Sequence, residues 1–440
     1  MARPSAGDGR RRDVRGTPGR LALLLALAAL AVAGCDDPAV SEPVPSPTTT
    51  PVPPPHAWTP PARDWSAVPG ILGPDGQAVA VSEVGAGEPS GTVPVEVVRT
   101  HRYRPEGDDI VRVLDLRPDG SAVVALVRLD DFDGGTLELL APARLALWSE
   151  AGLVPLGSTE GLVPGDPYRE AAVAAATDTA VVWLETSLTG VGEPRWRFFR
   201  ASPDAGAAPA LLVRSEDASA GAGGRPLLDA SGPAVVGDRL VWASSHTGAG
   251  DAVGSAVLSV PLDGGEVRVE AEGAALPAAT DAGLAVLRLP AGGGAGGPTG
   301  IDLLAPGGEA RPLVRFPGPA AAGGHVPTLV ADGTLVAWVL DHHLYVTTVD
   351  GGEVQRVRTP GPVDPYGVVV CDGRVVWTPE HEEDAWPTAA YVLDPATGQV
   401  SVLGTGPHAA GVTCGGPYLS WVQVEPTTDE VSVVVGRWTD

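Results

Sequence analysis

The sequence predicts an all-β fold, and three observations lead to this prediction. The stretch Val326–Gly361 reads as four short strands rich in β-branched residues, separated by Asp and Gly residues that suit tight hairpin turns. Looser copies of this unit recur along the chain at a spacing of about 40–50 residues. The 440 residues include 58 Gly and 45 Pro but only 19% charged residues, which is unusual for a helical enzyme. A four-stranded unit repeated at this spacing is typical of a β-propeller.

The repeats predict about seven four-stranded blades, with six or eight as alternatives. The last unit has only three strands, whereas a lone strand, Thr92–Tyr103, precedes the first unit. We therefore predict that Thr92–Tyr103 is the fourth strand of the last blade and closes the ring, which removes exposed sheet edges. The predicted units are Ile110–Gly157, Ala171–Arg214, Ala234–Glu270, Ala278–Phe316, Val326–Arg358, Gly367–Gly404 and Gly411–Trp438.

One large apolar side chain recurs in the second strand of most units. We expect these tryptophans to pack between blade faces, because they fall once per unit in mid-strand; docking of a flat cofactor is the alternative. They are Trp183, Trp242, Trp338, Trp377 and Trp421.

The N-terminus has the features of an export signal. Arginines precede an apolar run, Leu21–Ala33, which is short for a membrane span but fits a signal peptide. The run ends at Val32–Cys35, which resembles the lipobox of bacterial lipoproteins. This resemblance implies that Cys35 is lipidated and becomes the mature N-terminus, and two acyl chains suffice for stable anchoring. An ordinary secretory signal or an uncleaved anchor with an incidental cysteine is the alternative.

The domain organisation follows from these features. We predict a signal peptide at 1–34, a Pro-rich extended tether at 35–66, an N-terminal segment with the closing strand at 67–104, and the propeller at 105–440. The chain has a net charge of −25. Removal of the arginine-rich signal would leave about −29, which repels nucleic acids and anionic lipid surfaces. The prediction is an extracytoplasmic monomer, anchored to the outer face of the cytoplasmic membrane through its lipid.

Three segments resemble the repeats of TolB-like propellers. They are LRPDGSAVVALV (116–127), VLSVPLDGGEVRV (257–269) and LYVTTVDGGEVQRV (344–357), in which a Pro-Asp-Gly turn precedes the second strand or an Asp-Gly-Gly turn joins the third and fourth. The resemblance implies a propeller in an exported protein that binds other proteins. It carries over no catalytic residue, because the repeat motif contains none.

The connections between second and third strands are mostly long, and several are acidic. Antiparallel order places them on one face of the ring, together with the connections between blades. Long loops on a rigid scaffold commonly bind partners, although each loop could also be merely solvated. We predict a partner-binding face that includes Asp130, Asp131, Asp133, Glu193, Asp251 and Glu425.

Two neighbouring loops on this face could hold a divalent metal, because imidazole and carboxylate are suitable ligands. The alternative is a pair of solvated acidic loops. The residues are Asp341, His342, His343, His381, Glu382, Glu383 and Asp384. A calcium loop at Asp130–Gly134 does not match the EF-hand pattern, because Leu129 would occupy the first ligand position. No cofactor is required by this interpretation.

Cys371 and Cys414 end the first strands of consecutive units. In an exported protein with Cys35 lipidated, the two remaining cysteines most simply form a disulfide, with two buried free thiols as the alternative.

The sequence favours a non-enzymatic function. It contains no lysine, which excludes lysine Schiff bases and P-loops, and it contains no Gly-x-Ser-x-Gly nucleophile motif. We expect a protein-binding or scaffold module of the bacterial cell envelope. The alternative is an envelope enzyme that acts on a glycan or small molecule through acidic loop residues.

Overall fold

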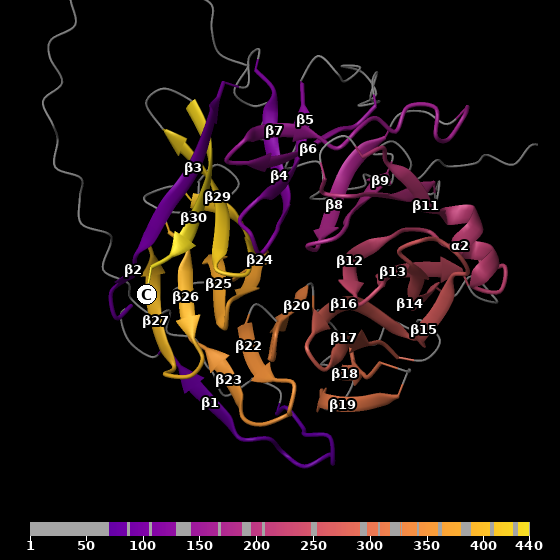
Figure 1. Cartoon of the computed structure of the whole chain (residues 1–440). Coiled ribbons are helices and arrows are strands. Elements are labelled where there is room, and N and C mark those ends of the chain that lie inside the picture. The colour runs from indigo at the N-terminus through magenta and orange to yellow at the C-terminus, as the bar shows by residue number, and fades with distance from the viewer. Residues whose placement is uncertain are drawn as a thin grey trace, which may run out of the picture. The chain divides into compact units, whose positions relative to one another are not determined.

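Seven four-stranded antiparallel cores surround a common axis and form a β-propeller (Figure 1). The structure is a computed structural model, and its described residues all lie within one compact unit, Ala57–Asp440. It describes residues 70–85, 89–104, 108–128, 142–165, 169–186, 195–204, 207–247, 253–290, 297–306, 309–316, 326, 328–340, 343–359, 363–379, 389–404, 409–425 and 430–439. The predicted fold class and the number of seven blades are thus confirmed.

Each blade runs from an inner first strand to an outer fourth strand. Blade 1 contains β4 (Ile110–Leu116), β5 (Ala122–Val127), β6 (Arg144–Ser149) and β7 (Gly152–Pro155); blade 2 contains β8 (Glu170–Ala176), β9 (Val181–Thr186), β10 (Trp196–Ala201) and β11 (Ala210–Arg214). Blade 3 contains β12 (Ser231–Val236), β13 (Arg239–Thr247), β14 (Val253–Pro261) and β15 (Arg268–Glu272); blade 4 contains β16 (Ala274–Thr280), β17 (Gly283–Arg288), β18 (Gly300–Leu304) and β19 (Ala310–Arg315). Blade 5 contains β20 (Thr328–Asp332), β21 (Leu335–Leu340), β22 (His343–Thr348) and β23 (Val354–Val357); blade 6 contains β24 (Val363–Cys371), β25 (Arg374–Pro379), β26 (Tyr391–Asp394) and β27 (Gln399–Leu403). Blade 7 contains β28 (Ala409–Gly415), β29 (Tyr418–Glu425), β30 (Glu430–Trp438) and β3 (Val95–Tyr103).

The predicted closure is confirmed, because β3 pairs antiparallel with β30 as the outer strand of blade 7. The bounds of the predicted closing strand are wrong at one end. Thr92 and Val93 form a separate strand, β2 (Thr92–Val93), which pairs with β27 of blade 6. Pro94 separates the two strands, and a proline cannot donate the N–H that a continuous ladder requires.

The N-terminal segment forms a strap along the outer edges of four successive blades, which the sequence did not predict. Leu72 bridges to Arg315 of blade 4. Strand β1 (Val81–Val84) then pairs parallel with β23 of blade 5, β2 pairs parallel with β27 of blade 6, and β3 completes blade 7 (Figure 1). The strap, residues 70–103, is therefore integrated into the propeller.

The strap is attached by both apolar and charged contacts. Ile71 is buried within the core of blades 4 and 5. Glu83 forms ion pairs with Arg356 and Arg358 on and beside β23. The Glu83–Arg358 pair joins residues 275 positions apart in the chain, so the strap ties the beginning of the described chain to its C-terminal blades.

The tryptophans of the second strands pack in the core, as predicted. All of them are fully buried side chains: Trp183, Trp242, Trp338, Trp377 and Trp421. Several pack against aromatic residues of the adjacent third strand; Trp338, for example, stacks on Tyr345 with ring centroids 5.5 Å apart. Apolar packing of these large rings between blades contributes to the stability of the ring.

Polar contacts also join the inner strands of neighbouring blades. The carboxylate of Asp115 in blade 1 accepts the N–H of Ala176 in blade 2 at 2.6 Å. Asp332 in blade 5 accepts the N–H of Asp372 in blade 6 at 3.1 Å. Between blades 7 and 1, Gly415 comes so close to the chain at Leu116 that a Cβ atom would clash with its carbonyl oxygen.

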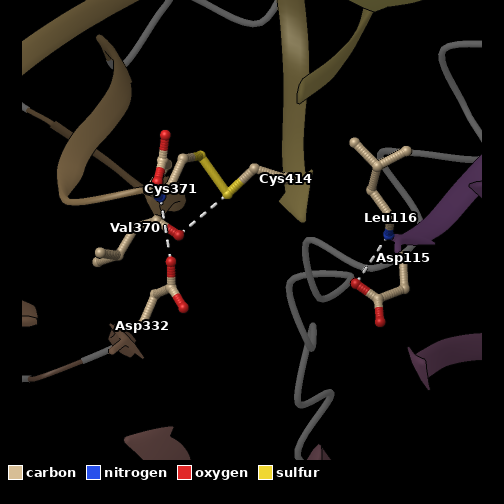
Figure 2. The surroundings of a disulfide bond; sticks show 7 residues. Asp115, Leu116, Asp332, Val370, Cys371 and Cys414 are labelled. Atoms are coloured by element: carbon tan, nitrogen blue, oxygen red, sulfur yellow. Dashed lines mark hydrogen bonds between the residues drawn. A yellow bond between two sulfur atoms is a disulfide. The ribbon is translucent and has the colours of Figure 1, made fainter. Parts of the chain in front are cut away.

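A disulfide joins the inner strands of blades 6 and 7. It links Cys371 and Cys414, whose Cα atoms are 5.7 Å apart, and thus joins the two cysteines that the sequence analysis paired. Figure 2 shows this bond, with the Sγ atom of Cys414 3.0 Å from the carbonyl oxygen of Val370 and with Asp332 and Asp115 nearby. The bond ties blade 7, which contains the closing strand β3, to its neighbour.

Two further features complete the fold. A short helix, α2 (Ser215–Gly221), follows β11 and packs into the core between blades 2 and 3. Leu72 and Ala78 form an antiparallel bridge around a tight turn that precedes β1. Within the described residues, no helix is long and apolar enough to cross a membrane.

Candidate functional site

A cavity of 160 Å³ lies in blade 2, on the face that carries the connections between second and third strands. We call this face the loop face. The cavity is lined by Val163, Pro164, Gly165, Arg195, Trp196, Arg197, Arg214 and Glu216. Three of these residues are arginines and one is an acid, and two of the arginines, Arg197 and Arg214, form ion pairs with the neighbouring Glu185 and Asp217.

Four segments bring these side chains together. The connection from blade 1 to blade 2 supplies Val163–Gly165, and the residues entering and beginning β10 supply Arg195–Arg197. Arg214 ends β11, and Glu216 belongs to α2. Because β10 runs away from the loop face and β11 runs back towards it, the start of one strand and the end of the other meet at the same rim.

Strand alternation separates the side chains at the start of β10. Trp196 and Phe198 face the core between blades 2 and 3, where the Trp196 ring lies 5.8 Å from that of Trp242. Arg197 lies on the opposite side of the strand, with its guanidinium 5.4 Å from the ring centroid of Phe199. Aromatic rings thus pack against both sides of β10 next to the cavity.

Arg197 is held by a buried carboxylate. Its Nε atom donates to Glu185 at 3.0 Å, and both side chains are buried. Glu185 also accepts hydrogen bonds from Trp183 Nε1 at 3.2 Å and from the Thr159 hydroxyl at 3.0 Å. Burial raises the pKa of Glu185, and the nearby Arg197 guanidinium opposes that rise.

Contacts at the junction of β11 and α2 position the outer wall of the cavity. Arg214 donates two hydrogen bonds to the Asp217 carboxylate, at 3.1 and 3.3 Å. The Ser215 hydroxyl donates to Glu216 at 3.3 Å. These contacts restrict the charged side chains of this wall to a few orientations.

Trp196 carries one polar atom without a partner. The side chain is 3% exposed, and within the described part of the chain its Nε1 atom has no hydrogen-bond acceptor. The indole ring thus packs in the core between blades 2 and 3, behind the cavity wall.

This cavity was not predicted from the sequence. The stretch Arg195–Arg200 contains three arginines around aromatic residues, which is a recognisable signal in an acidic chain. No such signal marks Val163 and Pro164 as cavity residues, because they lie about 30 residues earlier in a connection between blades.

Most of the sequence-predicted site residues lie outside the described residues. These are Cys35, Asp130, Asp131, Asp133, Glu193, Asp251, Asp341, His342, His381, Glu382, Glu383 and Asp384. His343 begins β22 and is half-buried, and Glu425 ends β29 next to the loop face. In the part of the chain that the structure describes, no group of His, Cys, Asp or Glu is arranged to hold a metal ion. The predicted metal site, which falls mainly on the other residues, stays a prediction.

No protein-family model and no curated protein sequence matches the chain. Among solved structures, it is similar to a puromycin-hydrolyzing peptidase of Mycobacterium tuberculosis, with 14% identity and a TM-score of 0.47. That match covers 80% of this chain and 56% of the peptidase, so the chain spans little more than half of that protein.

Two other similar structures are propeller domains. One belongs to the Trilobed protease of Pyrococcus furiosus, with 10% identity, a TM-score of 0.47, and 75% of this chain and 98% of that chain covered. The other is the WD40 domain of Neurospora crassa Pan2, with 9% identity, a TM-score of 0.44, and 80% and 100% covered. These similarities at low identity give no information about activity.

Proposed function

We propose that this protein is a non-enzymatic binding module of the bacterial cell envelope, anchored to the membrane by a lipid on Cys35. Its loop face recognises another envelope protein. The TolB-like character of its repeats supports this proposal, as does the lipobox at Val32–Cys35. The Pro-rich tether would hold the propeller away from the membrane surface and leave the loop face accessible.

The observation that carries the proposal is the arginine-lined cavity on the loop face. Arg is among the residues most enriched at the energetic centres of protein interfaces. Here the exposed Arg195 precedes a core strand and lies next to the buried Glu185–Arg197 pair. A rigid scaffold of this kind reduces the entropy lost when a partner binds.

The alternative, an enzyme that acts on a glycan or small molecule, depends on the acidic loops outside the described residues. Hydrolysis of a glycosidic bond commonly uses a pair of carboxylates on either side of the bond. Of the described residues around the cavity, only Glu216 places a carboxylate in the wall. The cavity therefore favours binding over this chemistry.

Site-specific crosslinking in native envelopes tests the proposed function. A photo-crosslinking residue replaces Glu160, which is exposed on the loop-face connection between blades 1 and 2, and a matched variant carries it at Asp238, in an exposed turn on the opposite face. We expect a discrete crosslinked protein from position 160 and none from position 238. Equal labelling of the same proteins from both positions would contradict recognition through the loop face.

Membrane anchoring is tested separately. Substitution Cys35→Ala should release the protein from the membrane fraction, because the thiol that carries the lipid is lost. A Cys371→Ala, Cys414→Ala double variant serves as the control and should remain membrane-bound. Retention of the Cys35→Ala variant in the membrane would exclude lipid anchoring at this residue.

A further inference from the structure

We infer that the outer edge of blade 7, formed by β3, binds an extended segment of a partner polypeptide as an added parallel strand. The inference goes beyond the proposed function, because this edge lies on the rim of the ring and not on the loop face (Figure 1). It is carried by the length of β3, by its uncovered outer side, and by the strands that the chain itself adds to equivalent edges.

The first argument is the length of the edge. β3 has nine residues, whereas β7, β11 and β15, the outer strands with neither an added strand nor the Leu72 bridge, have four, five and five. β7 ends in Pro155, which has no N–H, and β11 and β15 each contain a bulge. Short strands, prolines and bulges protect edges against pairing. The bulge of β3 lies near its start, so Arg99–Tyr103 remains a continuous and unprotected edge.

The second argument is that the outer side of β3 is uncovered. Within the described residues, β3 pairs with β30 alone. Alternate residues of an edge strand turn their N–H and C=O groups away from the neighbouring strand. Val97 is 57% exposed, the highest value among the exposed large apolar side chains of the described chain, and Thr100 is also exposed. Outward backbone groups beside an exposed apolar side chain are the features that an added strand covers.

The third argument is that the chain adds strands to equivalent edges. In blade 5, the N–H of Val354 donates to the carbonyl oxygen of Ala80 in the strap at 3.3 Å. The N–H of Arg358 donates to Val84 of β1 at 3.0 Å. In blade 6, β27 pairs with β2 in the same parallel manner. Because β3 is the fourth strand of its blade, as β23 and β27 are, its outer edge can accept a parallel strand in the same way.

The fourth argument concerns the side chains of the ligand. β1 has the sequence VSEV, and its Glu83 lies opposite Arg356 of β23 and forms an ion pair with it. On β3, the side chain of Arg102 is 70% exposed and lies 3.5 Å from Glu430. β-branched residues favour an extended conformation on a pleated edge. We therefore expect a ligand segment that combines β-branched residues with a carboxylate, as β1 does.

A second copy of this chain is a less suitable occupant. Two-fold pairing through Arg99–Tyr103 would bring the basic side chains of both copies together, and like charges on neighbouring strands are destabilising. Two chains that each carry a net charge of −25 also repel each other. Self-association through β3 is therefore the alternative that the experiment must distinguish.

Fluorescence anisotropy with a defined peptide tests the inference on the full chain. The probe is a labelled peptide with blocked ends and the sequence AVAVSEVG, residues 78–85, because this segment contains β1. The control peptide carries backbone N-methyl groups on Val81 and Ser82, neighbouring residues whose N–H groups point to opposite edges of a strand. We expect saturable binding of the probe and binding of the control that is about tenfold weaker or more, because neither of its edges can form a complete ladder.

Photo-crosslinking locates the bound peptide. A photo-crosslinking residue replaces Thr100 in β3, and in the matched control it replaces Val269 in β15; both side chains are exposed on outer strands. We expect a crosslink to the peptide from position 100 and none from position 269, because β15 is short and bulged.

Proline substitutions connect binding to the backbone of β3. Thr100→Pro and His101→Pro are compared, because one of two neighbouring residues turns its N–H outward. Proline is tolerated on an edge strand where its nitrogen faces solvent. The variant with this geometry should keep the urea midpoint of the parent but bind the peptide about tenfold more weakly or worse. Thr100→Ala and His101→Ala control for the loss of each side chain.

Four results would overturn the inference: equal binding of the probe and the N-methylated peptide, equal crosslinking from positions 100 and 269, unchanged affinity in the proline variant that keeps its midpoint, or no binding at millimolar peptide. If both proline variants are destabilised, the first two comparisons decide. Crosslinks between two copies of the chain through position 100 would assign the edge to self-association instead. Capture of an envelope protein from position 160 is independent of these outcomes, so the inference and the proposed function can fail separately.

Discussion

The propeller is stabilised differently on its two sides. Blades 4–7, which we call the strapped arc, are bound along their outer edges by residues 70–103 and joined internally by the Cys371–Cys414 disulfide. Blades 1–3, the open arc, end in β7, β11 and β15, with which no further described strand pairs. The open arc contains the arginine-lined cavity and its buried ion pair. Added strands and a covalent bond thus stabilise the strapped arc, whereas in the open arc side-chain contacts hold charged groups in place.

The largest effect is expected in the open arc, on loss of the Glu185 carboxylate. Glu185→Ala leaves the buried Arg197 guanidinium without its ion-pair partner, which should cost about 3–5 kcal/mol in the free energy of unfolding. Urea unfolding followed by circular dichroism measures the change. The double variant Glu185→Leu, Arg197→Met removes both charges and should recover most of the loss. An unchanged urea midpoint in Glu185→Ala would show that the Glu185–Arg197 pair does not stabilise the open arc.

The next effect is expected in the strapped arc. Replacing Cys371 and Cys414 together by Ala removes the disulfide, which closes a segment with a sequence separation of 43 residues. The expected loss is about 2–4 kcal/mol in the free energy of unfolding, because the unfolded chain gains conformational freedom. Reduction of the parent protein with dithiothreitol should lower its urea midpoint to that of the variant. Equal urea midpoints for the oxidised parent and the variant would show that the disulfide does not stabilise the strapped arc.

A pH-dependent effect is expected at Asp115, where the inner strands of blades 1 and 2 meet. Burial raises the pKa of Asp115 from 3.8 to about 7, against the lowering effect of hydrogen bonds from the N–H groups of Leu116 and Ala176. The folded state therefore holds a proton more tightly than the unfolded chain does. The stabilising contribution is complete below the unfolded pKa and is lost as pH rises through about 7.

Asp115→Asn should abolish this dependence. Relative to the variant, the parent should lose roughly 1–2 kcal/mol of unfolding free energy between pH 5 and pH 8, after allowance for the partial solvent access of the side chain. Urea unfolding of both proteins at four pH values measures the difference in their unfolding free energies. Other titrating groups contribute equally to both proteins and cancel in this difference. A constant difference across the range would contradict a raised pKa.

The smallest effects are expected from exposed ion pairs, and they should be similar in both arcs. Glu272→Gln breaks a pair with Arg225 at 2.8 Å in the open arc, and Glu430→Gln breaks a pair with Arg102 at 3.5 Å in the strapped arc. Each should change the free energy of unfolding by less than about 1 kcal/mol, because water screens exposed charges. A larger loss in either variant would mean that the difference between the arcs extends to their surfaces.

The sequence was informative where a local pattern repeats. Alternating apolar residues and Asp-Gly turns predicted seven blades, and the three-stranded last unit predicted the closure by Thr92–Tyr103, correct except for the two residues before Pro94. The five second-strand tryptophans were correctly predicted to be core residues. These features depend on strand periodicity and on turn chemistry, which are readable within about ten residues.

The sequence was less informative where distant segments meet. The parallel pairing of Val81–Val84 with β23 has no local signal, because a four-residue strand can pair with any open edge. The cavity combines Pro164 with Arg195 and Arg214, and only the folded blade brings these positions together. Long-range contacts of this kind are decided by the three-dimensional arrangement and not by any single stretch of sequence.

The strap has a consequence for the order in which the protein can be built. Residues 70–103 are synthesised before any blade, but their pairing partners in β23, β27 and β30 lie between Val354 and Trp438. Each strand of the strap must therefore remain unpaired until its own partner has been synthesised, and β3 must wait for the last blade. The loop that joins β3 to β30 is among the longest that the described chain forms. Such closure is slow, because the entropy of the long loop is lost before the contacts that compensate for it are made. The ring therefore cannot close before β30 has been synthesised, and a chain truncated before β30 has no partner for its own first long strand.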